Sequence, residues 1–510
     1  MRISTLSYIL LIIHLAASPL GLAGQSNHAF SDSIRTRITL TGKILDSNEN
    51  ALPYVNIYRS NGVEGTISNE HGAFSWSFKP TEGRGDSVFF QSMGYKTQGF
   101  ALPQSDTNIV LVLQEDLIQL NEMVIYAQTP SADDLIQRVQ ENIARNYPYQ
   151  YQGSQFFYRS RTTMNLRKLD AQFDKSSLES IHAGLVDSIR DHFPDELMSF
   201  TDLVGKLYRS GNPNDSVRQK VVADKAVSLD DANLDFAFEV IETLNKQMEE
   251  ASNNEYWRVK SGLYRKEISH SSAGDNPISD KMQEKQTQTL RNLRYSFKNE
   301  MAFADLSDED RWEFIYHPRR YEFTIAGGTL IDGEEVYRID FSPRRRGLYA
   351  GRIFVSSKSY AILKADFGLA PGKVGRDFWF PGIQYEEQAL HLIIQFEAVG
   401  DHYRLKYLSN QSAEALQFDR KVKLQKVKDR FLFPKVLEEV AVRFDFDLFN
   451  EESVEILIVD RFPVESTVFR SLKENRSLNV QYVNQFSDAD WEAYSIIEPT
   501  QAMKDYRRKE

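Results

Sequence analysis

Residues 62–76 read GVEGTISNEHGAFSW, and they decide between two kinds of fold for the start of the chain. The three glycines of this stretch suit either a loop that cradles a phosphate or two strands with their turn. A phosphate loop would lead into a helix, because the helix N-terminus binds the anion. Phe74, Trp76 and Phe78 instead alternate with other residues, as in a strand with one buried face. The stretch therefore predicts a β-fold in which glycine serves turn geometry.

Short segments with the same alternation lie on both sides of this stretch. They cover residues 37–45, 54–58, 87–91, 95–100, 108–114 and 121–127. Turn-rich sequences such as DSNEN at 46–50 separate them. Together with 72–78 they make about seven short strands, a number and spacing typical of a small β-sandwich.

The motifs of this region resemble the carboxypeptidase-regulatory-like domain of exported proteins from Bacteroidetes-type bacteria. The motifs are GKILD at 42–46, LPYVNI at 52–57, GTISNEHGAF at 65–74 and MGY at 93–95. Asn69 stands where this family more often has Asp, and Met93 where it more often has Val. The resemblance covers residues 37–127. It implies a seven-stranded transthyretin-like sandwich that is not itself catalytic.

The first residues of the chain have the features of a secretory signal peptide. Arg2 supplies a positive start, residues 9–17 are mostly apolar, and Gly21-Leu22-Ala23 resembles a cleavage site between small residues. An uncleaved anchor is the alternative, but the apolar run is shorter than the roughly 20 residues that a spanning helix needs. We expect residues 1–23 to be removed near Ala23 and residues 24–36 to form a polar linker. The protein would then be exported to the periplasm or be associated with the outer membrane.

Composition and charge exclude several classes of site. The formal net charge of -11 argues against a nucleic-acid partner, because such a protein needs a basic face. The chain has no cysteine, so it has neither disulfides nor thiolate metal ligands. None of the nine histidines has the His-Glu spacing of a zinc carboxypeptidase. We therefore reject that activity and expect no metal, no cofactor and no catalytic residue.

The remaining three quarters of the chain predict a larger α+β domain over residues 151–510, with a long, curved antiparallel sheet. Residues 128–150 predict a connecting helix, because a capping sequence at Ser131 precedes apolar residues at helical spacing. We expect a helical insertion at about 176–256, where Leu234, Phe238 and Ile241 lie on one stripe. Residues 269–288 are polar and predict an exposed or mobile segment.

The C-terminal strands carry a second resemblance. The segments YRIDFSP at 337–343, GRIFV at 351–355 and SYAILKADF at 359–367 are similar to the curved sheet of outer-membrane lipoprotein-sorting carrier proteins. This resemblance implies an open half-barrel whose concave apolar face can hold a lipid or a peptide segment.

Two groups of residues are candidate ligand or surface contacts. Arg344, Arg345 and Arg346 form a cationic tip that can touch phosphate head groups or acidic glycans, although such a run also suits a solvated turn. Phe378, Trp379 and Phe380 can line a ligand groove, because aromatic rings stack on sugars and apolar chains. The alternative for these three is burial in a packed core.

The sequence favours a non-catalytic envelope protein that binds or assembles with a protein, glycan or lipid. The first alternative is a hydrolase of envelope polymers whose acid and base carboxylates one sequence does not reveal. The second is an accessory component of an outer-membrane transporter. A deep pocket with convergent carboxylates would favour the hydrolase, whereas an apolar groove or an aromatic surface would favour binding. The identity of the partner and the oligomeric state stay open.

Overall fold

The structure is a computed structural model of the 510-residue chain. It describes residues 37–60, 65–79, 86–116, 130–230, 255–262, 264–268, 277–331, 334–428, 434–491 and 494–507. The expected signal peptide, the polar linker and the expected strand at 121–127 lie outside these residues.

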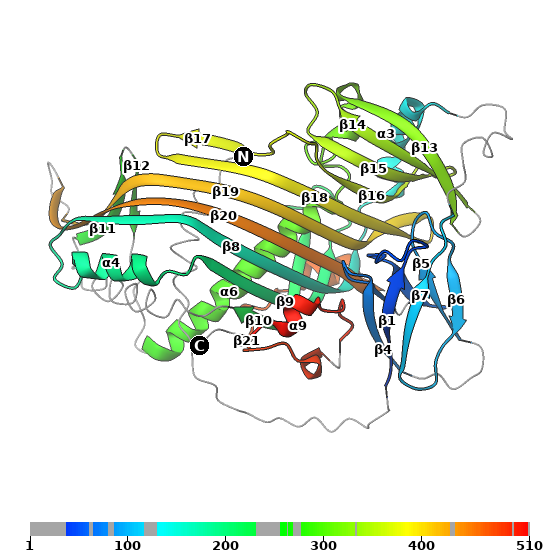
Figure 1. Cartoon of the computed structure of the whole chain (residues 1–510), viewed down its shortest axis with the longest axis horizontal. Helices are drawn as coiled ribbons and strands as arrows, with labels where there is room; N and C mark the ends of the chain where they lie inside the picture. Colours follow the sequence, from blue (N-terminus) through cyan, green and yellow to red (C-terminus); the bar gives the residue numbers. More distant parts are fainter. Residues whose placement is uncertain are drawn as a thin grey trace.

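Within the described residues, the first unit consists of seven strands in two sheets (Figure 1). Six of them overlap strands that the sequence predicts, whereas β3 was not predicted and the predicted strand at 121–127 is not tested. The strands are β1 (Ile38–Leu45), β2 (Asn56–Arg59), β3 (Gly65–Ile67), β4 (Ala73–Phe78), β5 (Ser87–Gln91), β6 (Gln98–Ala101) and β7 (Thr107–Val112). One sheet has the order β4-β1-β7 and the other the order β3-β2-β5-β6. Alternate residues of β4, Phe74 among them, pack with Val88 and Phe90 of β5 in the core between the two sheets.

The turn before β4 gives Asn69 and Gly72 of the opening motif a role in backbone geometry. The side chain of Asn69 accepts hydrogen bonds from the backbone N–H groups of His71 and Ala73, at 2.9 and 3.0 Å. Gly72 closes the turn with a φ of 72°, which favours glycine. The prediction that glycine serves turn geometry is therefore confirmed for Gly72, whereas Gly65 lies in β3 and Gly62 lies outside the described residues.

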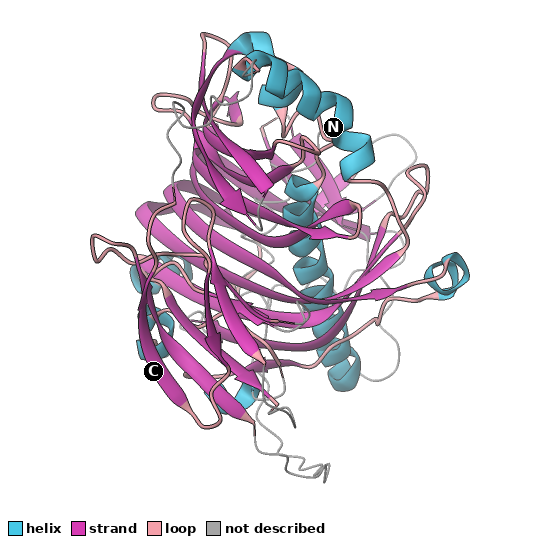
Figure 2. Ribbon diagram, turned by 90° about the vertical axis from the view of Figure 1, so that its right-hand side faces the viewer, coloured by secondary structure: helices cyan, strands magenta, loops and turns pink. Residues whose placement is uncertain are grey.

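The larger unit contains a 14-stranded mixed sheet among the described residues. The path β13-β14-β15-β16-β18-β19-β20-β8-β9-β10-β21 is antiparallel apart from the parallel pair β10 and β21. Its strands are β8 (Gln152–Ser176), β9 (Glu196–Arg209), β10 (Gln219–Asp230), β11 (Glu255–Ser261), β12 (Tyr264–Ile268), β13 (Tyr321–Ile331), β14 (Glu334–Pro343), β15 (Tyr349–Ser356), β16 (Ile362–Leu369), β17 (Asp377–Phe380), β18 (Ile383–Val399), β19 (His402–Lys428), β20 (Lys435–Pro463) and β21 (Val480–Tyr482). Figures 1 and 2 show these strands as one long, curved sheet.

Three helices, α3 (Ala132–Asn146), α6 (Pro277–Met301) and α7 (Glu313–Tyr316), pack against one face of this sheet, which we call the inner face (Figure 2). The other helices among the described residues are α4 (Ala183–His192), α8 (Ser466–Ser471) and α9 (Gln501–Asp505), with short 3-10 turns η1 (Ala302–Ala304), η2 (Pro318–Arg320) and η3 (Asp488–Trp491). Helix α3 begins with a capping box in which Ser131 and Asp134 each accept from the other's backbone N–H, as the sequence predicts. No helix among the described residues has the length and apolar character that a membrane-crossing helix needs.

Alternation along the strands divides the apolar residues of the large sheet between its two faces. Phe156 and Tyr158 of β8 pack on the inner face with Phe297 of α6. Phe157, between them in sequence, packs on the opposite face, which we call the outer face, with Tyr407 and Leu457.

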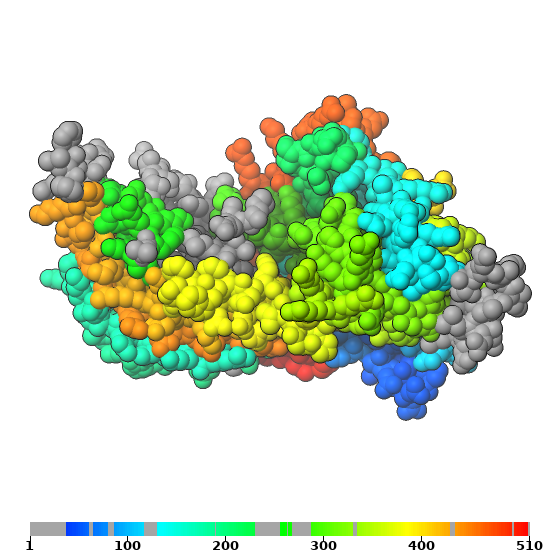
Figure 3. Space-filling view, turned by 90° about the horizontal axis from the view of Figure 1, so that it is seen from above, coloured from blue at the N-terminus to red at the C-terminus, as the bar shows by residue number. Residues whose placement is uncertain are grey.

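The sandwich docks on this outer face. Tyr54 stacks on Tyr407 with 5.2 Å between ring centroids, and Ile67 is buried in the same cluster. Asn69 donates a hydrogen bond to the carbonyl of Glu498 at 3.1 Å. Figure 3 shows the sandwich (blue) and the C-terminal segment (red) on one side of the yellow and orange strands. The opening motif therefore supplies both a turn of the sandwich and its contact with the rest of the chain.

The expected helical insertion at 176–256 is wrong for the described residues of that span. Strands β9 and β10 occupy 196–230, and only α4 is helical there. Leu203 and Val204 of β9 are both buried because the inner and outer faces are both covered, so the strand lacks the alternation that identifies a half-buried strand. The stripe from Leu234 to Met248 lies outside the described residues.

The polar segment at 269–288, expected to be exposed or mobile, contains the start of a helix that the sequence did not predict. Its second part, from Pro277, is the beginning of α6. The sequence analysis missed the start of this helix because its residues are mostly polar, and a helix is recognised in sequence by apolar residues at helical spacing. Residues 269–276 lie outside the described part of the chain.

Candidate functional site

A trough on the outer face of the large sheet is the candidate binding site. It has a volume of about 300 Å³ and crosses β17, β18, β19, β20 and β8. We call it the outer-face trough, and it is lined by Lys168, Trp379, Gly382, Ile383, Gln384, Gln417, Phe418, Asp419, Asp445, Phe446 and Asp447. The volume falls at the lower end of the range for small-molecule sites.

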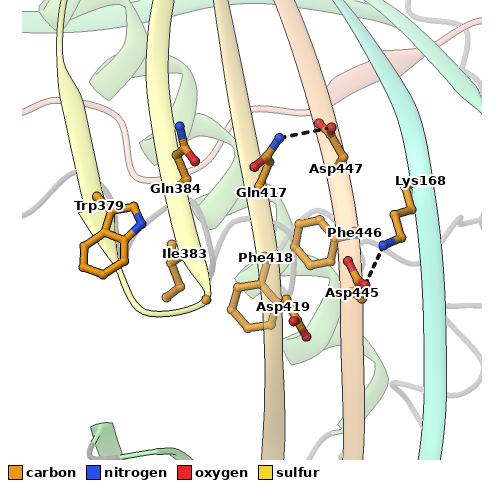
Figure 4. Close-up of a pocket in the computed structure, with 11 residues that line it drawn as sticks. Lys168, Trp379, Ile383, Gln384, Gln417, Phe418, Asp419, Asp445, Phe446 and Asp447 are labelled. Atoms are coloured by element: carbon orange, nitrogen blue, oxygen red, sulfur yellow. Dashed lines mark hydrogen bonds and ion pairs between the residues drawn. The ribbon is translucent and has the colours of Figure 1, made fainter.

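Strand register brings the polar side chains of the trough into a row. Gln384 of β18 lies opposite Gln417 of β19, and Gln417 lies opposite Asp447 of β20. Directly opposed residues project from the same face of a sheet, so the three side chains line up across the strands. Figure 4 shows this row, with the indole of Trp379 at one side of it.

The charged groups of the trough are partly neutralised by ion pairs. Lys168 donates to Asp445 at 2.6 Å, and this hydrogen bond raises the pKa of the lysine (Figure 4). Arg443 makes two hydrogen bonds to Asp419, at 3.0 and 2.9 Å. Two of the three carboxylates in the trough are therefore held by cations.

Asp447 differs from the other two carboxylates. Its Oδ2 accepts a long hydrogen bond of 3.4 Å from Gln417. Its Oδ1 is buried and has no hydrogen-bond partner among the described residues. A buried acceptor without a donor is costly, so a ligand hydroxyl or amide group that reached this oxygen would remove that cost.

The structure places the three predicted aromatic residues on β17, and burial of these residues is the wrong alternative. Phe378, Trp379 and Phe380 are 42%, 70% and 37% exposed. The cause is that β17 pairs only with β18 among the described strands. Trp379 lines the trough, whereas Phe378 and Phe380, its neighbours in the strand, project from the inner face.

The predicted arginines form an exposed tip between β14 and β15, away from the trough. Arg344 lies 3.5 Å from Glu322, and the carbonyl of Arg345 accepts a hydrogen bond from Lys373. Arg346 is exposed beside them. The tip therefore suits both the solvated turn and the anionic contact that the sequence left open.

A group of carboxyls lies on the inner face, where the hydrolase alternative must be weighed. Burial raises the pKa of Glu300 to about 7 and that of Glu452 to about 8, and repulsion from Glu300 contributes to the second shift. Asn410 donates to Glu300 at 2.8 Å. Carboxyls with raised pKa values are a common feature of catalytic acids. Neither of these two lines the outer-face trough.

Among the residues that the structure describes, no group of three or more His, Asp or Glu side chains is arranged to hold a metal ion.

Sequence reasoning identified Trp379 and missed the polar row. Gln384, Gln417 and Asp447 are separated by 33 and 30 residues of chain, and each is an ordinary polar residue of a strand. Only the register of three long strands brings them together. The sequence did offer one signal, the run of three aromatic residues at 378–380, because aromatic rings can line a ligand groove.

Comparisons with known proteins support the family resemblance of the first unit and give little information about the larger unit. No curated protein matches the chain. Among solved structures it is similar to an outer membrane lipoprotein-sorting protein domain from Vibrio parahaemolyticus, at 12% identity and a TM-score of 0.19, over 66% of this chain and 97% of that one. It is also similar to the MucA/MucB complex of Pseudomonas aeruginosa, at 10% identity and a TM-score of 0.16, over 62% of this chain and 93% of that one.

A membrane-associated protein from Bacteroides fragilis is similar at 8% identity and a TM-score of 0.13, over 83% of this chain and 97% of that one. Likeness at these scores carries no argument about function. The family model of the CarboxypepD_reg-like domain matches residues 40–125. The resemblance drawn from the motifs of the first unit is therefore confirmed.

Proposed function

We propose that the protein is a non-catalytic envelope binding protein whose outer-face trough holds a glycan. The observation that carries the proposal is the 70% exposed indole of Trp379 beside a row of amide and carboxylate groups. Aromatic faces stack on the apolar faces of sugar rings, and the polar row offers acceptors and donors for the hydroxyl groups. The unpartnered Oδ1 of Asp447 supplies one such acceptor.

The trough supports binding better than hydrolysis. Asp419 and Asp445 are held in ion pairs with Arg443 and Lys168, so they are committed as structural acceptors. The carboxyls with raised pKa values, Glu300 and Glu452, belong to the inner face. The envelope location is inferred from the first unit, because the domain family that it resembles occurs in exported proteins.

The arginine tip at Arg344–Arg346 stays a prediction as a contact for acidic glycans or phosphate head groups. The accessory role for an outer-membrane transporter likewise stays a prediction.

Titration of the full chain with soluble glycan fragments tests the proposal. The probes are an N-acetylglucosamine oligomer, a peptidoglycan disaccharide and an acidic oligosaccharide, with binding measured by calorimetry. We expect at least one probe to bind and W379A to weaken that binding by about tenfold, because stacking on an aromatic ring contributes about 0.5–1.5 kcal/mol beyond area burial. Tyr295, which is 64% exposed on α6, provides the matched control Y295A with unchanged affinity.

Three results would overturn the proposal. The first is equal affinity of W379A and the unaltered protein, and the second is no binding of any probe. The third is the appearance of cleaved glycan by chromatography, with cleavage lost in D447N, which would establish the hydrolase instead.

A further inference from the structure

Three arginines converge where two long strands of the sheet separate. Pairing between β19 and β20 ends at Tyr407 and Leu457. Beyond this point the first strand pairs with β18 and the second with β8. A small cavity of about 10 Å³ lies in the gap, with room for about one water-sized group. We call its cationic lining, formed by Arg209, Arg404 and Arg461, the arginine wedge.

One side of the wedge is balanced by a carboxylate. Arg461 makes an ion pair with Glu397 and also donates to the carbonyl of Leu405. Lys406 lies 3.9 Å from the same carboxylate and is buried. Glu397 therefore already serves two cations.

The other side has no carboxylate in contact. Arg404, which is only 8% exposed, donates to two neutral oxygens, Gln150 Oε1 at 2.5 Å and the carbonyl of Tyr403 at 3.1 Å. The guanidinium of Arg209 makes no hydrogen bond and no ion pair with any residue that the structure describes, although its backbone pairs with Gln152 and Gln219 in the sheet. Two guanidinium groups at the cavity thus lack an anionic partner.

Unbalanced buried charge is costly, and the protein does not remove it by losing protons. Burial, together with repulsion from Arg404 and Arg461, lowers the pKa of Arg209 to about 10, although Asp305 acts in the opposite direction. The group remains cationic at neutral pH. A charge in a poorly solvated place without a partner is costly, so an anion at this point would stabilise the folded protein.

We propose that the arginine wedge binds a phosphate group, with one phosphate oxygen in the cavity and the rest of the group at its mouth. Two guanidiniums without a carboxylate match the two negative charges of a phosphate monoester near neutral pH. The guanidinium fork also matches phosphate oxygens in geometry. A carboxylate ligand would leave one of the two charges unbalanced. The phosphate can be free or part of a lipid or glycan head group, and this site is separate from the outer-face trough.

The test compares melting temperatures of the full chain in chloride, inorganic phosphate and glycerol 1-phosphate at equal ionic strength and pH. We expect phosphate to raise the Tm of the unaltered protein by at least about 2 °C over chloride, because a ligand that binds only the folded state stabilises it. R209Q should lose this rise. In chloride it should melt at or above the unaltered protein, because a repulsive charge is removed. R345Q, on the exposed tip, is the control and should keep the full rise.

The comparison of phosphate with glycerol 1-phosphate also shows whether the bound phosphate is a free ion or part of a head group. A rise with glycerol 1-phosphate as large as with phosphate supports a head-group ester, and a rise with phosphate alone supports the free ion. Equal rises in R209Q and the unaltered protein, or equal effects of chloride and phosphate, would overturn the proposal. Should R209Q fail to fold, R404Q and the broadening of the phosphate ³¹P resonance by the unaltered protein provide the same comparison.

Discussion

At the scale of single residues, the inner-face carboxyl of Glu452 makes stability depend on pH. Burial raises the pKa of Glu452 to about 8 in the folded chain, whereas the same carboxyl in the unfolded chain has its usual pKa of about 4.5. Between these values the folded state holds a proton that the unfolded state has released. Stability therefore falls as pH rises from about 4.5 to about 8.

Replacing this carboxyl by an amide should remove that dependence. We expect E452Q to be close in stability to the unaltered protein at pH 5 and more stable at pH 8 by up to about 4 kcal/mol, since the pKa rises from 4.5 to about 8 and each unit corresponds to about 1.4 kcal/mol. Urea midpoints at pH 5, 6, 7 and 8 measure the difference. E322Q, at an exposed carboxyl on β13, should show no such trend. A difference that does not grow with pH would contradict the assignment.

At the scale of elements, the turn that leads into β4 depends on one glycine. Gly72 has a φ of 72°, and a Cβ there would lie 2.4 Å from the carbonyl oxygen of Ile44. Any other residue would meet both the strained conformation and this contact with β1. The motif GTISNEHGAF was therefore recognisable in sequence because backbone geometry, rather than a ligand, fixes its glycine.

Two alanine substitutions separate the cost of the strained backbone from the cost of the contact with Ile44. G72A should lower the free energy of unfolding by about 2–4 kcal/mol, from strain of about 1–2 kcal/mol plus the clash. G372A has a similar φ of 77° with no atom within 4 Å of the added Cβ, so it should cost only about 1 kcal/mol. Thermal melting of both variants gives the comparison. Equal losses would mean that the contact with Ile44 relaxes freely.

At the scale of the whole molecule, the sequence predicted what local patterns encode. The sandwich followed from the alternation of Phe74, Trp76 and Phe78, and helix α3 from the capping sequence at Ser131. The strands at 196–230 did not follow, because both of their faces are covered and the alternation is lost. The polar row of the trough and the arginine wedge also escaped prediction. Each is assembled from residues far apart in sequence by strand register, which local patterns do not specify.

The docking of the sandwich on the large sheet can be tested with a single substitution at their contact. Ile67 is fully buried and packs with Phe157 and Leu457 of the outer face rather than with the sandwich core. I67D would bury an unpaired carboxylate at this contact, which is costly, while leaving the core of the sandwich intact. We expect the single melting transition of the chain to split in two and the protein to become more extended by small-angle scattering. V110D, at a 70% exposed position of the same sandwich, should change neither property. A single unshifted transition in I67D would show that the two units do not stabilise one another.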